Sequence, residues 1–428
     1  MARRLAGRPG NRACEPPACH AHKIDLVADN SAVKDSAVKD SAVTKDSAVE
    51  SKGFPWQPGT ATGIGSLPGT DPMEAAHVVA AELADFPHLA ELPARGPGAD
   101  MIGRAAGLLI DIAVDTTPRG WRLSAERPGR DIRRARSMLS QDLDAMEEVL
   151  DGYAGILKVQ VAGPWTLAAS LEQAHSLTPA LADPGAVADI AASLAEGAAA
   201  HVAEVAKRVP GARIIVQYDE PSLPAVLEGS IPTPSGLSRV RAVDEEVVRD
   251  RLRTVLSATG RYCLVHCCAE TVPFGIVRGS GARAISFDLS LLKSSDLDYL
   301  AETAEAGLGL LLGIRGDTHT PATMARSVAD AWRRMGLPPA TCAPQVVITP
   351  ACGLAAESPH AARAALKRVR EAARILPEIM EEQRLWSSRK PVGGTRSSTR
   401  RCSTPSTGTT CSTRPRLTMV NMMRGSGS

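Results

Sequence analysis

Between about residue 53 and residue 385, short apolar runs alternate with longer stretches in which apolar residues recur every three or four positions. The short runs predict buried β-strands, and the longer stretches predict amphipathic helices. Long Ala-rich helices are expected over residues 185–209, 244–258 and 360–381, among others. Strands are expected at residues 61–68, 88–93, 156–164, 213–221, 262–268, 284–290, 309–316 and 345–353.

Eight strands separated by helices predict an α/β fold, a single (β/α)8 barrel of the TIM type. A doubly wound sheet is the alternative, and it would need a glycine-rich phosphate loop after the first strand. Gly63 and Gly65 lie too close together for that loop. In a TIM barrel, the chemistry gathers at the carboxyl ends of the strands. The polar residues expected at or near those ends are Ser66, Asp219, Glu220, His266, Cys268, Asp288, His319 and Cys352.

The two ends of the chain differ in composition from the region between them. Residues 1–52 contain a short degenerate repeat, in which Ser-Ala-Val recurs at residues 31–33, 36–38, 41–43 and 47–49. Small and charged residues of this kind bury little surface, so a disordered tail is predicted. Residues 386–428 are rich in Arg, Ser, Thr and Gly without apolar periodicity, and a second disordered tail is predicted there. The barrel domain is therefore expected to span residues 53–385.

Charge and cysteine content narrow the class of protein. The 49 basic and 47 acidic residues leave a net charge of +2, which argues against nucleic acid and anionic membrane as partners. No apolar run is long enough to span a bilayer, and no apolar segment follows the basic start of the chain. A cytoplasmic location is therefore predicted. Nine cysteines, an odd number, favour free thiols and metal ligands over a disulfide framework.

Two cysteines and a histidine form the strongest candidate site. In a strand over residues 262–268, His266 and Cys268 share one face, whereas Cys267 points to the other. Cys352 ends the last predicted strand, so a closed barrel brings it to the same rim. One imidazole and two thiolates suit zinc, and three protein ligands with an open fourth position are typical of a catalytic zinc site. Cys263 and Cys267 are expected to face the helix layer as structural residues.

Further polar residues extend this candidate site. Asp288 interrupts an otherwise apolar strand and is predicted to be an oxygen ligand to the same metal or a partner of His266. A helix cap is the alternative for Asp288. Gln217 and Asp219 share the inward face of their strand, where a carboxylate can hold an ammonium group. Ser66 follows glycines that permit close backbone approach, so its hydroxyl is a candidate for holding a carboxylate.

Taken together, these segments resemble the catalytic C-terminal barrel of the cobalamin-independent methionine synthase family. The resemblance runs from residue 59 to about residue 376. It implies a TIM-type barrel that uses zinc to methylate homocysteine to methionine, with methyltetrahydrofolate (polyglutamate) as the expected donor. The segments that carry it are residues 64–68 (Ile-Gly-Ser-Leu-Pro), 162–166 (Ala-Gly-Pro-Trp-Thr), 217–221 (Gln-Tyr-Asp-Glu-Pro), 266–268 (His-Cys-Cys), 319–321 (His-Thr-Pro) and 352–353 (Cys-Gly).

The resemblance also implies residue roles. The serine of the first segment would hold the homocysteine carboxylate, and the aspartate of the third would hold its amine. The family usually has Glu as its carboxylate zinc ligand, where this chain has Asp288. By this resemblance the metal ligands are His266, Cys268, Asp288 and Cys352, the substrate-binding residues are Ser66, Glu91, Trp165, Gln217 and Asp219, and the catalytic residues are Asp219 and His319.

Two alternatives keep the same site and change its use. The long form of the family has an N-terminal barrel that helps to bind the folate tail, and this sequence shows no counterpart to it. A methylcorrinoid protein is therefore the alternative methyl donor. The second alternative is a zinc-binding paralogue without catalytic activity, which the aspartate at position 288 favours.

Overall fold

The computed structural model describes residues 53–124, 129–315 and 320–389. Contacts divide the chain into two units, residues 1–51 and 52–428, and only the second contains described residues. The first predicted tail and nearly all of the second lie outside the described residues. At the carboxyl side, helix α12 (Pro359–Arg389) continues past residue 385, where the barrel domain was expected to end.

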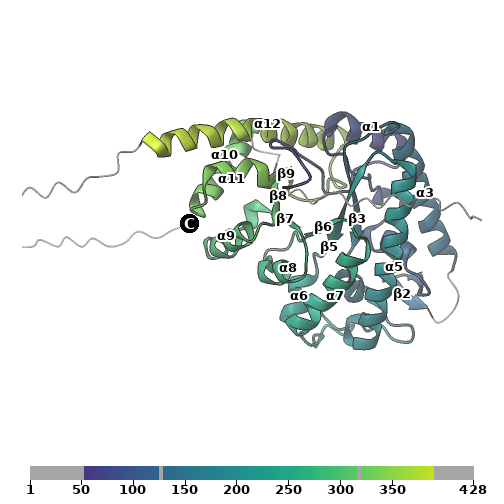
Figure 1. The fold of residues 1–428 in the computed structure, drawn as a ribbon. Helices are drawn as coiled ribbons and strands as arrows, with labels where there is room; N and C mark the ends of the chain where they lie inside the picture. The colour runs from purple at the N-terminus through teal and green to yellow at the C-terminus, as the bar shows by residue number, and fades with distance from the viewer. Residues whose placement is uncertain (1–52, 125–128, 316–319, 390–428) are drawn as a thin grey trace, which may run out of the picture. The chain divides into compact units, whose positions relative to one another are not determined.

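A curled parallel sheet forms the centre of the second unit (Figure 1). Its six strands pair in the order β3-β5-β6-β7-β8-β9, and every pairing is parallel. All of the carboxyl ends therefore meet at one rim of the sheet. The strands are β3 (Ile156–Ala162), β5 (Arg213–Asp219), β6 (Tyr262–His266), β7 (Ala284–Asp288), β8 (Gly309–Ile314) and β9 (Val346–Pro350).

The first two predicted strands complete the barrel as extended segments rather than as regular strands. Isolated parallel bridges join Ala61 to Ile348 of β9 and His88 to Lys158 of β3. A further bridge between Ser66 and Glu91 joins the two segments to each other. The predicted TIM-type barrel is therefore confirmed, although these two segments are less regular than expected.

Close packing against interior side chains explains this irregularity. A Cβ atom at Gly63 would lie 2.2 Å from Cε1 of His88, and one at Gly65 would lie 2.5 Å from Nε2 of Gln160. Glycine permits this close approach of the backbone, but it weakens a regular strand.

Helices cover the outer face of the sheet, as Figure 1 shows. Aspartate side chains cap several of them: Asp71, Asp183 and Asp244 accept hydrogen bonds from backbone N–H groups in the first turns of α1, α5 and α7. The helices before α12 are α1 (Pro72–Glu82), α2 (Met101–Leu108), α3 (Arg130–Val149), α4 (Pro164–Ser170), α5 (Pro184–Arg208), α6 (Leu223–Glu228), α7 (Glu245–Ala258), α8 (Phe274–Gly279), α9 (Leu297–Glu305), α10 (Pro321–Arg334) and α11 (Pro339–Gln345).

A small second sheet was not predicted from the sequence. The hairpin β1 (Ala113–Thr117) and β2 (Gly120–Ser124) pairs through β2 with the short strand β4 (Leu171–Glu172). Arg122 of β2 donates to the carboxylate of Glu172 at 2.6 Å. These runs are short and partly polar, so the apolar pattern does not reveal them.

Two apolar clusters stabilise the barrel. The larger cluster lies between the sheet and the helices and includes Cys263, which confirms that this thiol faces the helix layer. The smaller cluster fills the amino-terminal end of the barrel, where Trp56 stacks on Phe86 and meets the ring of Tyr262 edge-on. The indole of Trp56 also donates to the carbonyl of Pro344 at 3.1 Å. The barrel is therefore closed at the end opposite the strand carboxyl ends.

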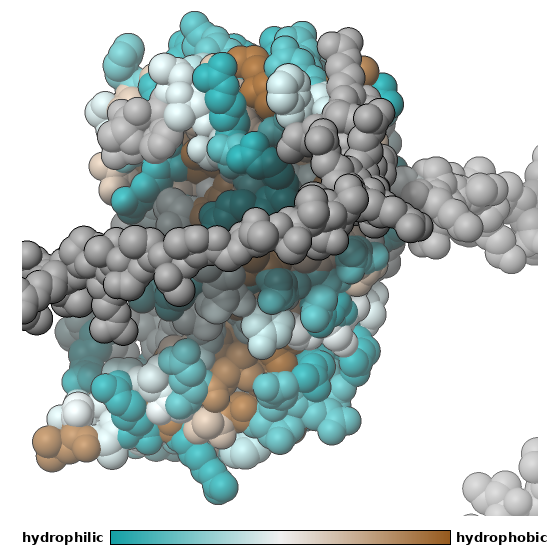
Figure 2. Space-filling view, turned by 90° about the vertical axis from the view of Figure 1, so that its left-hand side faces the viewer, coloured by the Kyte–Doolittle hydropathy of each residue, from teal (hydrophilic) through white to brown (hydrophobic). Residues whose placement is uncertain are grey.

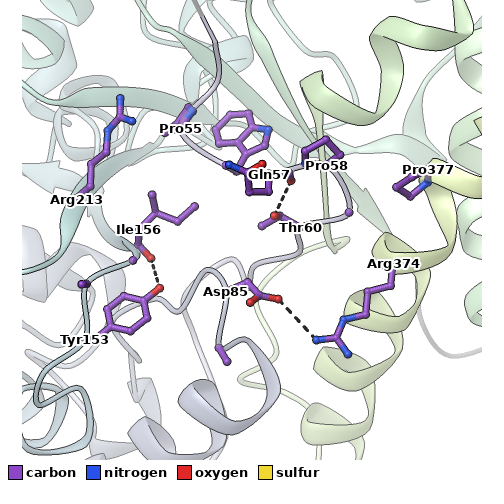
Figure 3. Close-up of a pocket in the computed structure, with 15 residues that line it drawn as sticks. Pro55, Gln57, Pro58, Thr60, Asp85, Tyr153, Ile156, Arg213, Arg374 and Pro377 are labelled. Carbon is purple, nitrogen blue, oxygen red and sulfur yellow. Dashed lines mark hydrogen bonds and ion pairs between the residues drawn. The ribbon is translucent and has the colours of Figure 1, made fainter. Parts of the chain in front are cut away.

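A cavity of about 740 Å³ lies beside this closed end. Figure 3 shows Tyr153 and Asp85 on its lining, with Arg374 of α12 pairing with Asp85 at 3.7 Å. None of the predicted site residues that the structure describes lines this cavity. The catalytic chemistry of a TIM barrel lies at the other end, so the size of this cavity does not make it the active site.

The outer surface is largely hydrophilic on the face that Figure 2 shows. The exposed large apolar side chains of the described residues lie on separate elements, apart from the adjacent Leu385 and Trp386. No helix in the described part of the chain combines the length and the apolar character needed to cross a membrane. The exposed large apolar residues are Leu177, Leu237, Val247, Tyr299, Leu385 and Trp386.

A buried ion cluster links α2, α3 and the segment after residue 91. Asp142 of α3 accepts from Arg95 at 2.5 Å and also from Arg104, and all three side chains are buried. A buried charge that loses its partner is strongly destabilising, because its desolvation is no longer offset. Asp142 therefore neutralises two cations that the fold places out of water.

We expect Asp142→Ala to lower the free energy of unfolding by about 3–5 kcal/mol, because Arg95 loses its buried counter-ion and Arg104 keeps only the longer contact with Glu91. Urea unfolding measures the change. Asp330→Ala is the matched control, since Asp330 pairs with Arg333 on the exposed face of α10. An exposed pair contributes at most about 1 kcal/mol, so equal losses in the two variants would contradict the role of Asp142.

Candidate functional site

Three side chains meet at the rim formed by the strand carboxyl ends. His266 is the last residue of β6, Cys268 lies two positions beyond it, and Cys352 follows the end of β9. One ligand atom from each residue lies within 4.8 Å of the other two. The residues that sequence reasoning proposed as the core of a metal site are therefore brought together, from positions far apart in the chain.

The imidazole of His266 is held from one side. Its Nδ1 lies 2.9 Å from the hydroxyl of Ser286, which stands opposite it on β7. Its Nε2 is buried and has no hydrogen-bond partner among the described residues. A buried ring nitrogen without a partner is costly unless it binds a ligand. A hydrogen bond to the other ring nitrogen is the usual way in which a metal-binding histidine is oriented.

The ligand atoms of the two thiols lie within 4.8 Å of each other, close enough for each to change the pKa of the other. Contact with Cys268 and with His266 lowers the pKa of Cys352 well below its usual value. The same contact with Cys352, together with burial, raises the pKa of Cys268. The pair therefore tends to hold one proton and one negative charge. Thiolate is the form that binds metals, so one imidazole and this thiol pair form a donor set that fits Zn²⁺.

Cys267 lies outside this group, although its neighbours on both sides belong to it. Strand β6 ends at His266, but the backbone N–H of Cys267 still donates to the carbonyl of Ser286 at 2.9 Å. The extended backbone therefore continues far enough to separate the side chains of Cys267 and Cys268, as strand parity predicts.

Asp288 is not part of the group. It is the last residue of β7, and its Oδ1 accepts from the backbone N–H of Ser290 at 2.8 Å and from the Ser290 hydroxyl at 2.7 Å. The carboxylate thereby caps the 3₁₀ turn Leu289–Leu291. The alternative to metal binding was a cap for a helix expected to begin near residue 296. Asp288 does act as a cap, but of the shorter turn that directly follows it.

Ser66 and Glu91 lie beside Cys352. The carbonyl of Ser66 accepts from the N–H of Leu354 at 2.8 Å, and a Cβ atom at Gly353 would lie 2.1 Å from the Ser66 hydroxyl. The bridge between Ser66 and Glu91 brings the second side chain to the same rim. Two of the residues predicted to bind the substrate, Ser66 and Glu91, thus lie on the same rim as the group of His266, Cys268 and Cys352.

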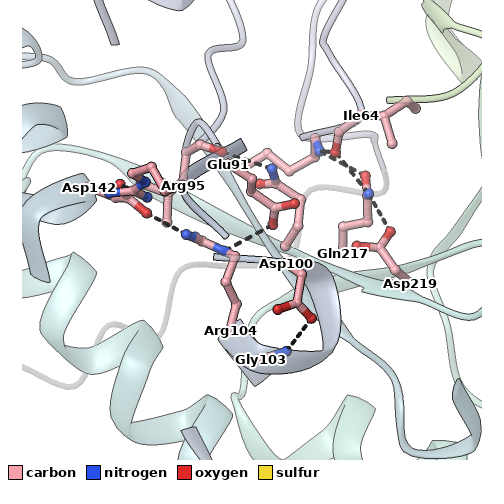
Figure 4. Close-up of polar contacts among 12 residues, drawn as sticks. Ile64, Glu91, Arg95, Asp100, Gly103, Arg104, Asp142, Gln217 and Asp219 are labelled. Carbon is pink, nitrogen blue, oxygen red and sulfur yellow. Dashed lines mark hydrogen bonds and ion pairs between the residues drawn. The ribbon is translucent and has the colours of Figure 1, made fainter. Parts of the chain in front are cut away.

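Asp219 stands opposite His266 in the β5–β6 register. Its carboxylate is buried, and burial raises its pKa. Gln217 donates from Nε2 to Asp219 Oδ1 at 2.7 Å and to the carbonyl of Ile64 at 3.0 Å, while its Oε1 accepts from Lys158 at 2.8 Å (Figure 4). Gln217 is thus occupied within the protein, so it orients Asp219 rather than offering free polar atoms to a substrate.

Glu91 forms the second carboxylate of this region. Burial raises its pKa to about 7, and the nearby guanidinium of Arg104 opposes the rise. The Nε of Arg104 lies 3.6 Å from Glu91 Oε1 (Figure 4). Through Arg104, this carboxylate is connected to the buried cluster around Asp142.

Two predicted residues fall outside the assembled site. The side chain of Trp165 has no exposed surface, and its Nε1 donates to the carbonyl of Val248 in α7 at 3.2 Å. Its indole packs α4 against α7, so the predicted substrate contact is replaced by a packing role. His319 lies outside the described residues.

Sequence reasoning missed several polar residues that support the site. Lys158 and Gln160 alternate with apolar residues on β3, and this alternation is a signal that they share one face. Glu220 was noted as part of the polar cluster, but its role was not predicted. Its buried carboxylate accepts from the backbone N–H groups of Trp165 and Thr166 at the start of α4, at 3.0 and 2.8 Å.

Comparison with known proteins identifies a family and a similar fold. The family model described as "Cobalamin-independent synthase, Catalytic domain" matches residues 59–375. A solved structure of a B12-independent methionine synthase from Shewanella sp. W3-18-1, in complex with selenomethionine, is similar with a TM-score of 0.51 and 14% identity, over 77% of this chain and 99% of that chain. No curated protein sequence matches this chain.

A weaker likeness is found with N-acetylneuraminate lyase from Fusobacterium nucleatum, complexed with pyruvate. Its TM-score is 0.36 at 8% identity, over 79% of each chain. This likeness is too weak to support a functional conclusion.

The fold and the site define a barrel enzyme with an imidazole and two thiols at the strand carboxyl ends. The match over residues 59–375 is more specific: the chain belongs to the cobalamin-independent methionine synthase family, and the match is to its catalytic domain. The resemblance inferred from the short motifs is thereby confirmed.

We expect the pH dependence of stability to report on Glu91. Its pKa is raised from 4.5 to about 7, so the folded state binds more protons than the unfolded state between these values. Stability from this group is therefore lost as the pH rises through that window, by about 1–3 kcal/mol. In Glu91→Gln the loss between pH 5 and pH 7, followed by urea unfolding, should be smaller than in the unmodified protein. An identical loss in both would contradict a buried, raised carboxyl at Glu91.

Proposed function

We propose that this protein is a zinc-dependent homocysteine S-methyltransferase that makes methionine. The observation that carries the proposal is the group of His266, Cys268 and Cys352, whose ligand atoms lie within 4.8 Å of one another beside a buried, unpartnered Nε2. Three protein ligands of this kind match a catalytic zinc centre, which keeps one position open. Family membership supports the same reaction.

His266, Cys268 and Cys352 would hold the metal, and Ser286 would fix the ring of His266. Bound Zn²⁺ supplies the Lewis acidity that keeps a substrate thiol deprotonated at neutral pH. This matters because an ordinary thiol has a pKa near 8.5 and only its thiolate is a good nucleophile. Asp288 could join them as a fourth ligand only by leaving its capping contact with Ser290, so the proposed resting site has three protein ligands.

The amino-acid part of homocysteine would bind beside the metal group. The Ser66 hydroxyl would hold the carboxylate, while the carboxylates of Asp219 and Glu91 would hold the ammonium group by charge-assisted hydrogen bonds. These residues lie on both sides of the group, through the Ser66 contact with Gly353 and the pairing of Asp219 with His266. The substrate sulfur would thereby be directed toward the three ligands.

The proposed donor is methyltetrahydrofolate, with a methylcorrinoid protein as the alternative. In the transfer, the bond between the substrate sulfur and the methyl carbon forms while the bond between that carbon and the donor nitrogen breaks. The leaving nitrogen keeps the electron pair and takes up a proton. His319 is proposed to donate this proton. The positioned thiolate and the exclusion of water favour this in-line displacement.

We expect Cys268→Ser and Cys352→Ser to lose bound zinc and to reduce methyl transfer by at least about 100-fold, because each removes a thiolate donor. Metal analysis and initial rates with homocysteine measure these effects. Cys267→Ser is the matched control, because Cys267 is equally close in sequence but lies outside the group. Full activity of Cys268→Ser would refute the proposal, and X-ray absorption should show a new zinc–sulfur contact when homocysteine is added.

We expect methyltetrahydrofolate to sustain methionine formation faster than methylcobalamin when each is offered at the same concentration. A folate donor needs a proton at its leaving nitrogen, and His319 is proposed to supply that proton. His319→Ala should then slow the folate reaction by about 10²-fold or more while changing the corrinoid reaction little. Turnover with methylcobalamin alone would favour the alternative donor.

A further inference from the structure

Lys158 is a fully buried lysine in the barrel interior, and neither the family resemblance nor the proposed reaction gives it a role. It lies in the middle of β3, and its side chain has no exposed surface. Its ammonium group donates to the carbonyl of Ile64 and to Oε1 of Gln217, both at 2.8 Å. A lysine is rarely buried without a strong reason, because its charge is costly to remove from water.

The contact with Lys158 decides how the Gln217 amide is oriented. An ammonium group is a donor only, so the oxygen of the amide must face it. The Nε2 group then faces the other way, where it donates to Asp219 Oδ1 at 2.7 Å. If the amide turned over, its oxygen would face the Asp219 carboxylate and its NH₂ group would face the ammonium. The lysine thus makes one amide orientation strongly preferred.

The same ammonium group reaches the segment that contains Ser66. The carbonyl of Ile64 accepts from both Lys158 and Gln217, at 2.8 and 3.0 Å. Ile64 lies two residues before Ser66, and the intervening Gly65 leaves no room for a side chain against Gln160. Lys158 therefore joins the segment proposed to bind the substrate carboxylate, through Ile64, to the residue proposed to bind the substrate amine, through Gln217.

We propose that Lys158 is a positioning residue that sets the spacing between the carboxylate-binding and amine-binding halves of the amino-acid site. It does so by donating to Ile64 on one side and, through Gln217, to Asp219 on the other. The inference rests on the proposed function, because it concerns the same substrate. It predicts that the preference for an intact α-amino acid depends on a residue that does not touch it.

Charge supports this geometry. The cation of Lys158 lowers the pKa of both Asp219 and Glu91, against the effect of burial. Ionised carboxylates are what an ammonium group requires. Burial lowers the pKa of Lys158 itself to about 7, while Asp219 and Glu91 oppose that change. The lysine and each carboxylate therefore favour each other's charged forms, whereas the charge of Asp219 raises the pKa of Glu91.

The test compares Lys158→Met with Gln345→Met in the zinc-loaded full-length protein. Gln345 is the matched control, because it is also buried and also makes two hydrogen bonds, both at 2.7 Å, to the carbonyls of Ala304 and Leu308. Isothermal titration measures the affinity for homocysteine and for its des-amino and des-carboxy analogues. Initial rates give KM and kcat in the same proteins.

We expect Lys158→Met to reduce the preference for homocysteine over each analogue by about tenfold or more, with KM rising far more than kcat falls. Gln345→Met should keep the preference, because its lost hydrogen bonds lie outside the site. A preference retained in Lys158→Met would overturn the role of the lysine alone. An unmodified protein without any preference for homocysteine would overturn the proposed amino-acid site as well.

A second variant covers the case in which Lys158→Met does not fold, as judged by circular dichroism. Gln217→Met removes the side chain that connects Lys158 to Asp219. It should show the same loss of preference for homocysteine over its des-amino analogue. An unchanged preference in Gln217→Met would overturn the proposal. When both variants fold, the double variant should lose no more preference for the amine than either single one, because Lys158 acts on Asp219 only through Gln217.

Discussion

The parallel register of the barrel strands is the constraint on which the site depends. It places His266 opposite Asp219 on one side and opposite Ser286 on the other. It also carries the end of β9, and with it Cys352, to the same rim. Because residues far apart in the chain become neighbours only through this pairing, a shift of one strand by one residue would turn His266 away from Cys352 and separate the proposed ligands.

The second requirement is that charge be compensated wherever the barrel buries it. Asp142 neutralises Arg95 and Arg104, and Arg104 in turn approaches Glu91. On the other side of the rim, Lys158 donates a hydrogen bond to Gln217, which in turn donates one to Asp219. Isolated charges in such surroundings would be costly, and carboxylates would take up protons instead. Each carboxylate proposed for substrate binding is therefore compensated by a buried cation, Glu91 by Arg104 and Asp219 by Lys158.

Much of this arrangement could be predicted from the sequence. Strand parity separated Cys267 from its neighbours, and strand ends selected His266 and Cys352, because both follow from local geometry. The inward packing of Trp165 depends on helices that meet only in the folded chain. The cap made by Asp288 is a contact with Ser290, two residues away, but the sequence alone does not decide between this cap and metal binding. The small β1–β2–β4 sheet was missed because its runs are short and partly polar. The role of Lys158 was missed because its partners, Ile64 and Gln217, lie far from it in the chain. Residues that act through tertiary contacts leave little local signal.

The contact that occupies Asp288 bears on how the proposed metal site works. Aspartate is one methylene shorter than the glutamate usual in the family, and here its Oδ1 already accepts two hydrogen bonds from Ser290. With Asp288 held in this way, His266, Cys268 and Cys352 remain as the protein donors. Three donors with an open position describe a catalytic centre, whereas four would describe a structural one. The shorter side chain therefore favours a site that accepts a substrate sulfur without first displacing a protein ligand.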